Sequence, residues 1–199
     1  RLSLFIIIFF IGCSNSPTEV VTTSAGKLQG YEINNTNYFL GIPFAEAPIG
    51  DLRWQPPKAI KNWDGVKITQ EVGPACMQPT NVGNTAFLEF MLNGFGLAWY
   101  EKFIINTLAL FGSTFEESNF SEDCLFLNVI APKDAKNLPV MFWIHGGASR
   151  FGSGGDSIYL TSRFAEKDVI LVTINYRLGS LGWFSPVSYT HLRAHETAS

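Results

Sequence analysis

The residues best suited to take part in a reaction follow the apolar run Val140–Ile144 and read His145-Gly146-Gly147-Ala148. Glycines directly after a strand let the backbone approach a ligand closely and leave N–H groups pointing outward. A carbonyl oxygen that becomes an oxyanion during acyl transfer needs fixed donors of this kind. An ordinary tight turn uses the same residue types, so the motif alone leaves both interpretations open.

The elements that would position this turn are predicted strands and a helix. Residues 126–130 and 140–144 are expected to be strands, and 169–174 is a continuous apolar run typical of a strand buried on both faces. Residues 157–167 are expected to be helical. The order strand, turn, helix and strand predicts a parallel α/β unit.

The pattern is different nearer the N-terminus. Short β-branched and aromatic runs at 20–24, 27–33 and 37–44 are separated by turn residues, which predicts an antiparallel meander. Residues 43–66 are rich in Pro and Gly and are expected to form an ordered loop. Residues 86–111 are strongly apolar and predict two short helices, which either pack in the core or form a flap over the site.

Composition argues against intrinsic disorder over most of the chain and against nucleic-acid binding. The chain has 199 residues, of which 46% are hydrophobic and 16% charged, so most of it has enough apolar surface to fold. Lys and Arg total 14 against 17 Asp and Glu, giving a net charge of −3. A chain with this charge lacks the broad basic surface that nucleic-acid binding requires, and we expect no nucleic-acid partner.

The N-terminus carries a predicted export signal. Residues 2–11 form an apolar run that is too short for an ordinary membrane-spanning helix and suits the core of a signal peptide at residues 1–12. The run ends in Gly12-Cys13, which resembles a bacterial lipoprotein signal. We expect lipidation of Cys13, a polar tether at 13–20, and a membrane-anchored, periplasmic or cell-surface location. A buried strand and an ordinary signal peptide are the alternatives.

The cysteine count fits an exported protein. The chain has three cysteines, and if Cys13 carries lipid, Cys76 and Cys124 remain as an even pair. The residue types alone allow either a disulfide or two free thiols.

An ordered series of motifs extends over nearly the whole chain. In order, the motifs are Lys27-Leu-Gln-Gly30, Phe39-Leu-Gly-Ile-Pro-Phe-Ala45, Leu52-Arg-Trp54, Ala75-Cys76-Met-Gln78, Ser121-Glu-Asp-Cys-Leu-Phe-Leu-Asn128, Trp143-Ile-His-Gly-Gly147 and Asn175-Tyr-Arg-Leu-Gly179. The series resembles the type-B carboxylesterase/cholinesterase family of the α/β-hydrolase fold, and a series is far more specific than one motif. The resemblance implies an α/β domain at residues 21–186, in which an antiparallel meander leads into a mostly parallel central sheet.

The resemblance also implies roles for particular residues. The family's oxyanion donors map to the backbone N–H groups of Gly147 and Ala148, which would act on a small-molecule ester without a cofactor. Ser149 stands where an aromatic residue is often found. 

Two further pairs match structural features of the family. Cys76 and Cys124 match the pair that closes its first disulfide loop, and Arg53 and Glu122 match a buried ion pair.

The catalytic groups of such an esterase are a Ser on a G-x-S-x-G elbow, followed by an acid and a His. The sequence contains no G-x-S-x-G, and we assign His145 to the turn rather than to general-base catalysis. The resemblance places the triad after Gly179. We therefore expect the N-terminal part of an exported serine carboxylic ester hydrolase, which is inactive alone. The alternative is a non-catalytic cholinesterase-like binding or adhesion domain, because the same fold serves both.

The last residues, 187–199, resemble translated vector sequence, and we expect a non-native tail there. His191 and His195 have the i, i+4 spacing of a zinc-binding helix, but Leu192 stands where the general base would be. We therefore expect no metal site.

Overall fold

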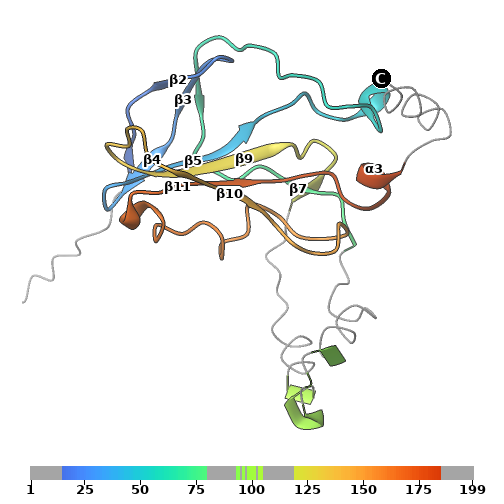
Figure 1. Ribbon diagram of the computed structural model, residues 1–199. Coiled ribbons are helices and arrows are strands. Elements are labelled where there is room, and N and C mark those ends of the chain that lie inside the picture. The colour runs from blue at the N-terminus through green and yellow to red at the C-terminus, as the bar shows by residue number, and fades with distance from the viewer. Residues whose placement is uncertain are drawn as a thin grey trace, which may run out of the picture.

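A six-stranded sheet forms the body of the computed structural model, which describes residues 15–79 and 119–184 and a few positions between 93 and 104 (Figure 1). The strand order is β1-β4-β5-β9-β11-β10. The bounds are β1 Ser16–Pro17, β4 Tyr31–Ile33, β5 Thr36–Pro43, β9 Phe126–Pro132, β10 Val140–Ile144 and β11 Ile170–Ile174. All neighbours pair antiparallel except β10 and β11, which are parallel. Antiparallel strands thus lead into one parallel pair, and within the described residues that pair is the only parallel part of this sheet, where the sequence predicted a mostly parallel one.

Several predicted features lie outside the described residues. They are the signal peptide at 1–12, the lipidation site Cys13, the tail at 187–199 and most of the apolar segment 86–111. The tether predicted at 13–20 contains β1. Within the described ranges, the helices are all too short or too polar to cross a lipid bilayer.

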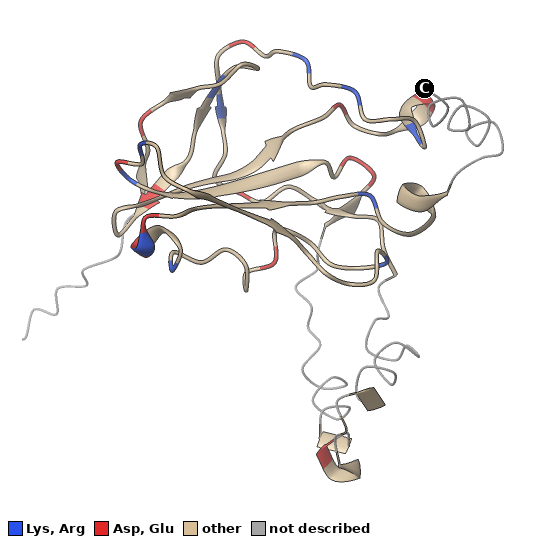
Figure 2. Ribbon diagram, in the orientation of Figure 1, with Lys and Arg blue, Asp and Glu red and all other residues tan. Residues whose placement is uncertain are grey.

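Two small sheets and several short helices complete the described part. The strands β2 Val21–Thr22, β3 Lys27–Gln29 and β6 Val66–Ile68 form one sheet, and β7 Ala75–Cys76 and β8 Phe120–Ser121 form the other. The helices include the 3-10 turns η1 Gly50–Leu52 and η3 Ala165–Lys167 and the α-helix α3 Gly179–Trp183, and the described positions at 93–94, 99–101 and 103–104 are also helical. The strands β5, β9, β10 and β11 contain no charged residue, and the charges lie in loops and outer elements (Figure 2).

The predicted run 27–33 is two strands in different sheets, so that part of the meander was wrong. The chain changes sheet at Gly30, where a side chain would overlap the Tyr38 carbonyl. Thr18 binds both backbone polar groups of Gly30. Its N–H donates to the Gly30 carbonyl at 3.2 Å, and its Oγ1 accepts from the Gly30 N–H at 3.0 Å. The break therefore depends on a contact that local sequence does not show.

The helix predicted at 157–167 was also wrong, because only η3 at its end is helical. The rest consists of turns in which side chains make local bonds. The Thr161 Oγ1 accepts from the Arg163 N–H at 3.3 Å, and the Ser162 hydroxyl donates to Glu166 at 2.7 Å. Bonds of this kind compete with helical backbone bonds. The parallel pairing of β10 with β11 is nevertheless confirmed.

A buried polar pair lies between β9 and β11. Asn128 is 3% exposed and Thr173 is 0% exposed, and they lie opposite each other in the sheet. The Asn128 Nδ2 donates to the Thr173 Oγ1 at 3.0 Å and to the Gly154 carbonyl at 3.2 Å, while its Oδ1 accepts from the Gly41 N–H at 3.0 Å. Buried amides of this kind are stable only when every bond is made.

Replacement of Asn128 by Leu should destabilise the fold, because it leaves the Gly41 N–H without its acceptor. We expect a loss of about 1–3 kcal/mol in the free energy of unfolding, measured by urea denaturation of the 199-residue chain. Replacement of the exposed Asn62 by Leu is the matched control and should change it by less than about 0.5 kcal/mol. Equal effects of the two substitutions would contradict the role of this buried network.

Candidate active site

The His145-Gly146-Gly147-Ala148 turn leaves the carboxyl end of β10 and reverses around one carbonyl. The Gly147 carbonyl accepts from the Arg150 N–H at 3.0 Å and from the Phe151 N–H at 3.2 Å. The Ser149 carbonyl accepts from the Gly179 N–H at 2.8 Å, which ties the turn to the start of α3. The turn is thus closed on itself and fixed to the segment that follows β11.

Three successive residues of the turn have positive φ. The values are 115° for Gly147, 54° for Ala148 and 59° for Ser149. Non-glycine residues adopt this region at a cost, and such strain is concentrated at functional sites. A side chain at Gly147 would overlap the Phe151 carbonyl, whereas one at Gly146 would meet no atom within 4 Å. Glycine is therefore required at the second glycine position only.

The strained backbone leaves a run of adjacent donors unused. Among the described residues, the N–H groups of residues 146–149, which include Gly147 and Ala148, have no hydrogen-bond acceptor, whereas those of Arg150, Phe151 and Gly152 all have one. Adjacent free N–H groups in a turn form a concave site for a negatively charged oxygen. The geometry therefore suits the two donor positions expected from the sequence.

His145 supports the turn from inside. The residue is 3% exposed, and its ring stacks on Tyr176 with a centroid distance of 4.4 Å. Its Nδ1 lies 2.8 Å from the Gly146 carbonyl, a contact that fits the tautomer with the proton on Nδ1. The Tyr176 hydroxyl donates to the His145 carbonyl at 2.9 Å, and burial raises the pKa of that hydroxyl.

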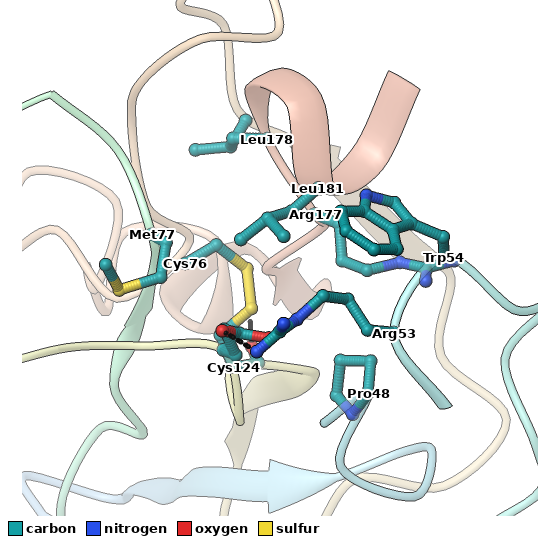
Figure 3. A pocket seen from close by; sticks show the side chains of 10 residues that line it. Pro48, Arg53, Trp54, Cys76, Met77, Cys124, Arg177, Leu178 and Leu181 are labelled. Carbon is teal, nitrogen blue, oxygen red and sulfur yellow. Dashed lines mark hydrogen bonds and ion pairs between the residues drawn. A yellow bond between two sulfur atoms is a disulfide. The ribbon is translucent and has the colours of Figure 1, made fainter. Parts of the chain in front are cut away.

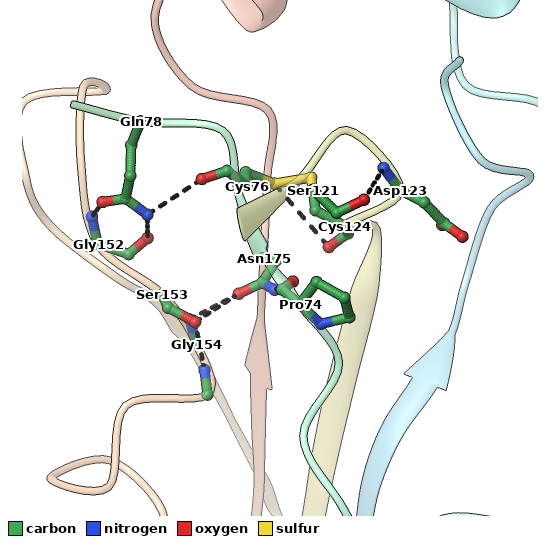
Figure 4. Close-up of a disulfide and its surroundings, with 11 residues drawn as sticks. Pro74, Cys76, Gln78, Ser121, Asp123, Cys124, Gly152, Ser153, Gly154 and Asn175 are labelled. Carbon is green, nitrogen blue, oxygen red and sulfur yellow. Dashed lines mark hydrogen bonds between the residues drawn. A yellow bond between two sulfur atoms is a disulfide. The ribbon is translucent and has the colours of Figure 1, made fainter. Parts of the chain in front are cut away.

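The glycine-rich segment after the turn is anchored by the side chain of Asn175 (Figure 4). Its Oδ1 accepts from the Gly154 N–H at 2.8 Å and from the Ser153 hydroxyl at 3.2 Å, and its Nδ2 donates to the Pro74 carbonyl at 3.0 Å. Asn175 and Gln78 belong to the motif series, but their residue types and spacing alone predicted no role for them. A polar residue directly after an apolar strand was the available signal.

A disulfide beside this segment joins β7 to the residues that follow β8 (Figure 4). Cys76 and Cys124 are buried and bridged, with a Cα–Cα distance of 4.9 Å, which confirms the pairing that the resemblance implied. Cys76 belongs to β7, and Cys124 follows β8. The bridge therefore fixes the residues that follow Cys76, of which Gln78 contacts Gly152 after the turn.

Arg53 and Glu122 form a two-point ion pair beside the disulfide. The Arg53 Nε donates to the Glu122 Oε2 and Nη2 donates to Oε1, both at 2.6 Å, and these bonds raise the pKa of the Arg53 guanidinium. The side chains are 40% and 26% exposed, so the pair is not buried as expected. It is partly exposed because both residues line a pocket open to solvent, together with Trp54 and the disulfide (Figure 3). This pocket includes no residue of the turn.

Substitution of the two glycines by Ala should separate their roles. We expect Gly147→Ala to lower the free energy of unfolding by about 1–3 kcal/mol, because it combines a strained φ with an overlap on Phe151. Gly146→Ala is the matched control and should stay within about 0.5 kcal/mol of the original chain. Both are measured by thermal and urea unfolding of the 199-residue chain. A larger loss for Gly146→Ala would contradict the geometry.

Comparison with known proteins assigns the family. A family model described as "Carboxylesterase family" matches residues 17–191. The para-nitrobenzyl esterase of Bacillus subtilis is 34% identical over 173 residues, which cover 86% of this chain and 30% of the relative. The fumonisin B1 esterase of Sphingopyxis macrogoltabida is 36% identical over 174 residues, which cover 86% and 27%.

Solved structures agree with the sequence comparison. A PNB esterase structure superposes with a TM-score of 0.68 at 35% identity, covering 86% of this chain and 30% of that structure. The chain thus spans about 30% of the length of this structure and of the first relative above. The matching structures are carboxylesterases, which confirms that the sheet is an N-terminal portion of the α/β-hydrolase fold. The chain belongs to the carboxylesterase family.

Proposed function

We propose that these residues are the oxyanion-binding N-terminal part of an exported serine carboxylic ester hydrolase. The observation that carries the proposal is the pair of free N–H groups at Gly147 and Ala148, held by a strained turn in a carboxylesterase-family chain. An adhesion or binding domain of the same fold has no need of these donors. Backbone strain of the kind held at Ala148 and Ser149 clusters at catalytic and ligand-binding sites, which favours a binding role for the turn.

The proposed reaction is acyl transfer through a covalent intermediate. A Ser hydroxyl, deprotonated by His, attacks the ester carbonyl carbon, and the carbonyl oxygen becomes an oxyanion. The N–H groups of Gly147 and Ala148 stabilise that oxygen. The alcohol then leaves with the proton from His, and water hydrolyses the acyl-enzyme. The reaction consumes the small-molecule ester and water, and it uses no cofactor.

The motifs present in the sequence decide which catalytic groups we assign to this chain and which to a longer protein. The chain contains no G-x-S-x-G, and it spans about 30% of the para-nitrobenzyl esterase length. In the proposal, the nucleophile, acid and base come from residues after Gly179 in a longer protein. In this proposal the 199-residue chain alone supplies oxyanion donors but none of the catalytic triad, so it gives no turnover.

Ester hydrolysis tests this proposal directly. We expect the longer protein to hydrolyse p-nitrophenyl butyrate and to react with a fluorophosphonate probe, while the 199-residue chain gives no release above the buffer rate. A longer protein that folds but shows neither reaction would favour the binding domain. Turnover by the 199-residue chain would contradict the assignment of the catalytic triad to a longer protein.

Export and anchoring form the second part of the proposal. A disulfide at Cys76–Cys124 is typical of oxidising compartments, and Gly12-Cys13 after an apolar run suits a lipoprotein signal. We expect Cys13→Ser to release the protein from the membrane fraction of a bacterial host, because it removes the thiol that carries lipid. Ser14→Ala is the neighbouring control and should stay membrane-bound. Unchanged fractionation of Cys13→Ser would contradict lipid anchoring.

A further inference from the structure

The side-chain amide of Gln78 holds a backbone segment 74 residues away. Its Oε1 accepts from the Gly152 N–H at 2.7 Å, and its Nε2 donates to the Gly152 carbonyl at 3.1 Å. The second Nε2 hydrogen goes to the Cys76 carbonyl at 3.1 Å. Both amide donors are therefore used, and both polar groups of Gly152 are bound by one side chain (Figure 4).

Gly152 in turn lies directly against the start of the turn. Its φ is 112°, and a side chain there would overlap the His145 Nδ1 and lie 2.8 Å from the Gly146 carbonyl. The Gly152 backbone therefore packs against the peptide that precedes Gly147. A shift of Gly152 would displace that peptide, because close-packed groups move together.

The position of Gln78 is itself fixed. It follows Cys76 by two residues, and Cys76 is held both by the disulfide to Cys124 and by the pairing of β7 with β8. The Gln78–Cys76 bond then orients the side chain. A rigid route thus runs from the disulfide through Gln78 to Gly152.

We propose that Gln78 is a positioning residue for the oxyanion turn, which sets the direction of the Gly147 and Ala148 N–H groups through Gly152. This inference rests on the proposed esterase function. Oxyanion donors act by being oriented before the reaction, and they act in the transition state more than in the ground state. Loss of the Gln78 bonds should therefore lower kcat and leave KM nearly unchanged.

The sharpest variant is Gln78→Glu, which keeps the shape of the side chain. The introduced carboxylate can accept from the Gly152 N–H but cannot donate to the Gly152 or Cys76 carbonyls. Gln70→Glu is the matched control: the Gln70 amide is exposed and donates only a long bond of 3.4 Å to the Gly30 carbonyl. Both variants add the same charge.

We expect Gln78→Glu to lower kcat of the longer protein by about 10- to 100-fold on p-nitrophenyl butyrate, with KM within about twofold. Gln70→Glu should retain the original kcat. The kcat ratio of Gln78→Glu to the original protein should rise as pH falls, because the protonated carboxyl regains a donor. An unchanged kcat in folded Gln78→Glu, or equal losses in both variants, would overturn the proposal. If Gln78→Glu does not fold, Gln78→Met should show the same kcat loss.

Amide hydrogen exchange separates this inference from the proposed function. In the 199-residue chain, Gln78→Glu should speed exchange at residues 145–152, and Gln70→Glu should not. If the longer protein hydrolyses no ester, the esterase function fails, and faster exchange still supports the positioning role. Unchanged exchange at 145–152 would overturn that role whatever the activity.

Discussion

The glycine-rich segment after β10 is buried at Ser153 and Gly154, and the backbone polar groups there must find partners. An unpaired buried N–H or carbonyl costs roughly 1–3 kcal/mol, so a segment without side chains depends on polar side chains from elsewhere. Gln78 binds Gly152, Asn175 binds the Ser153 hydroxyl and the Gly154 N–H, and Asn128 binds the Gly154 carbonyl. These three amides come from separate parts of the chain, and together they place the turn relative to β9 and β11.

The same constraint explains where strain is stored. The turn can hold Ala148 and Ser149 at positive φ because its far end is fixed at Gly152 and its carbonyl at Ser149 is bound by Gly179. Strained backbone persists only where its surroundings over-determine it. The disulfide at Cys76 contributes indirectly, since it fixes the residue two positions before Gln78.

The strands could be predicted from the sequence, because short apolar runs such as 126–130 and 169–174 are typical of strands within a sheet. The break at Gly30 could not, because it depends on Thr18 and on the Tyr38 carbonyl approaching closely. The turns at 157–167 depend on local Ser and Thr bonds that compete with helix formation. The burial predicted on both faces of 169–174 was wrong in part, because β11 alternates between buried and half-buried residues. All five residues of β10, at the edge of the sheet, are 40% to 59% exposed.

The donor positions could be named from the motif, whereas Gln78 acquires its role only through a contact across 74 residues. The central claim is that the Gly147 and Ala148 N–H groups bind the reacting oxygen. The most direct measurement is a crystal structure of the longer protein with a phosphonate bound to its nucleophilic Ser. We expect a phosphonyl oxygen about 2.7–3.1 Å from both nitrogens. An oxygen that contacts neither nitrogen would contradict it.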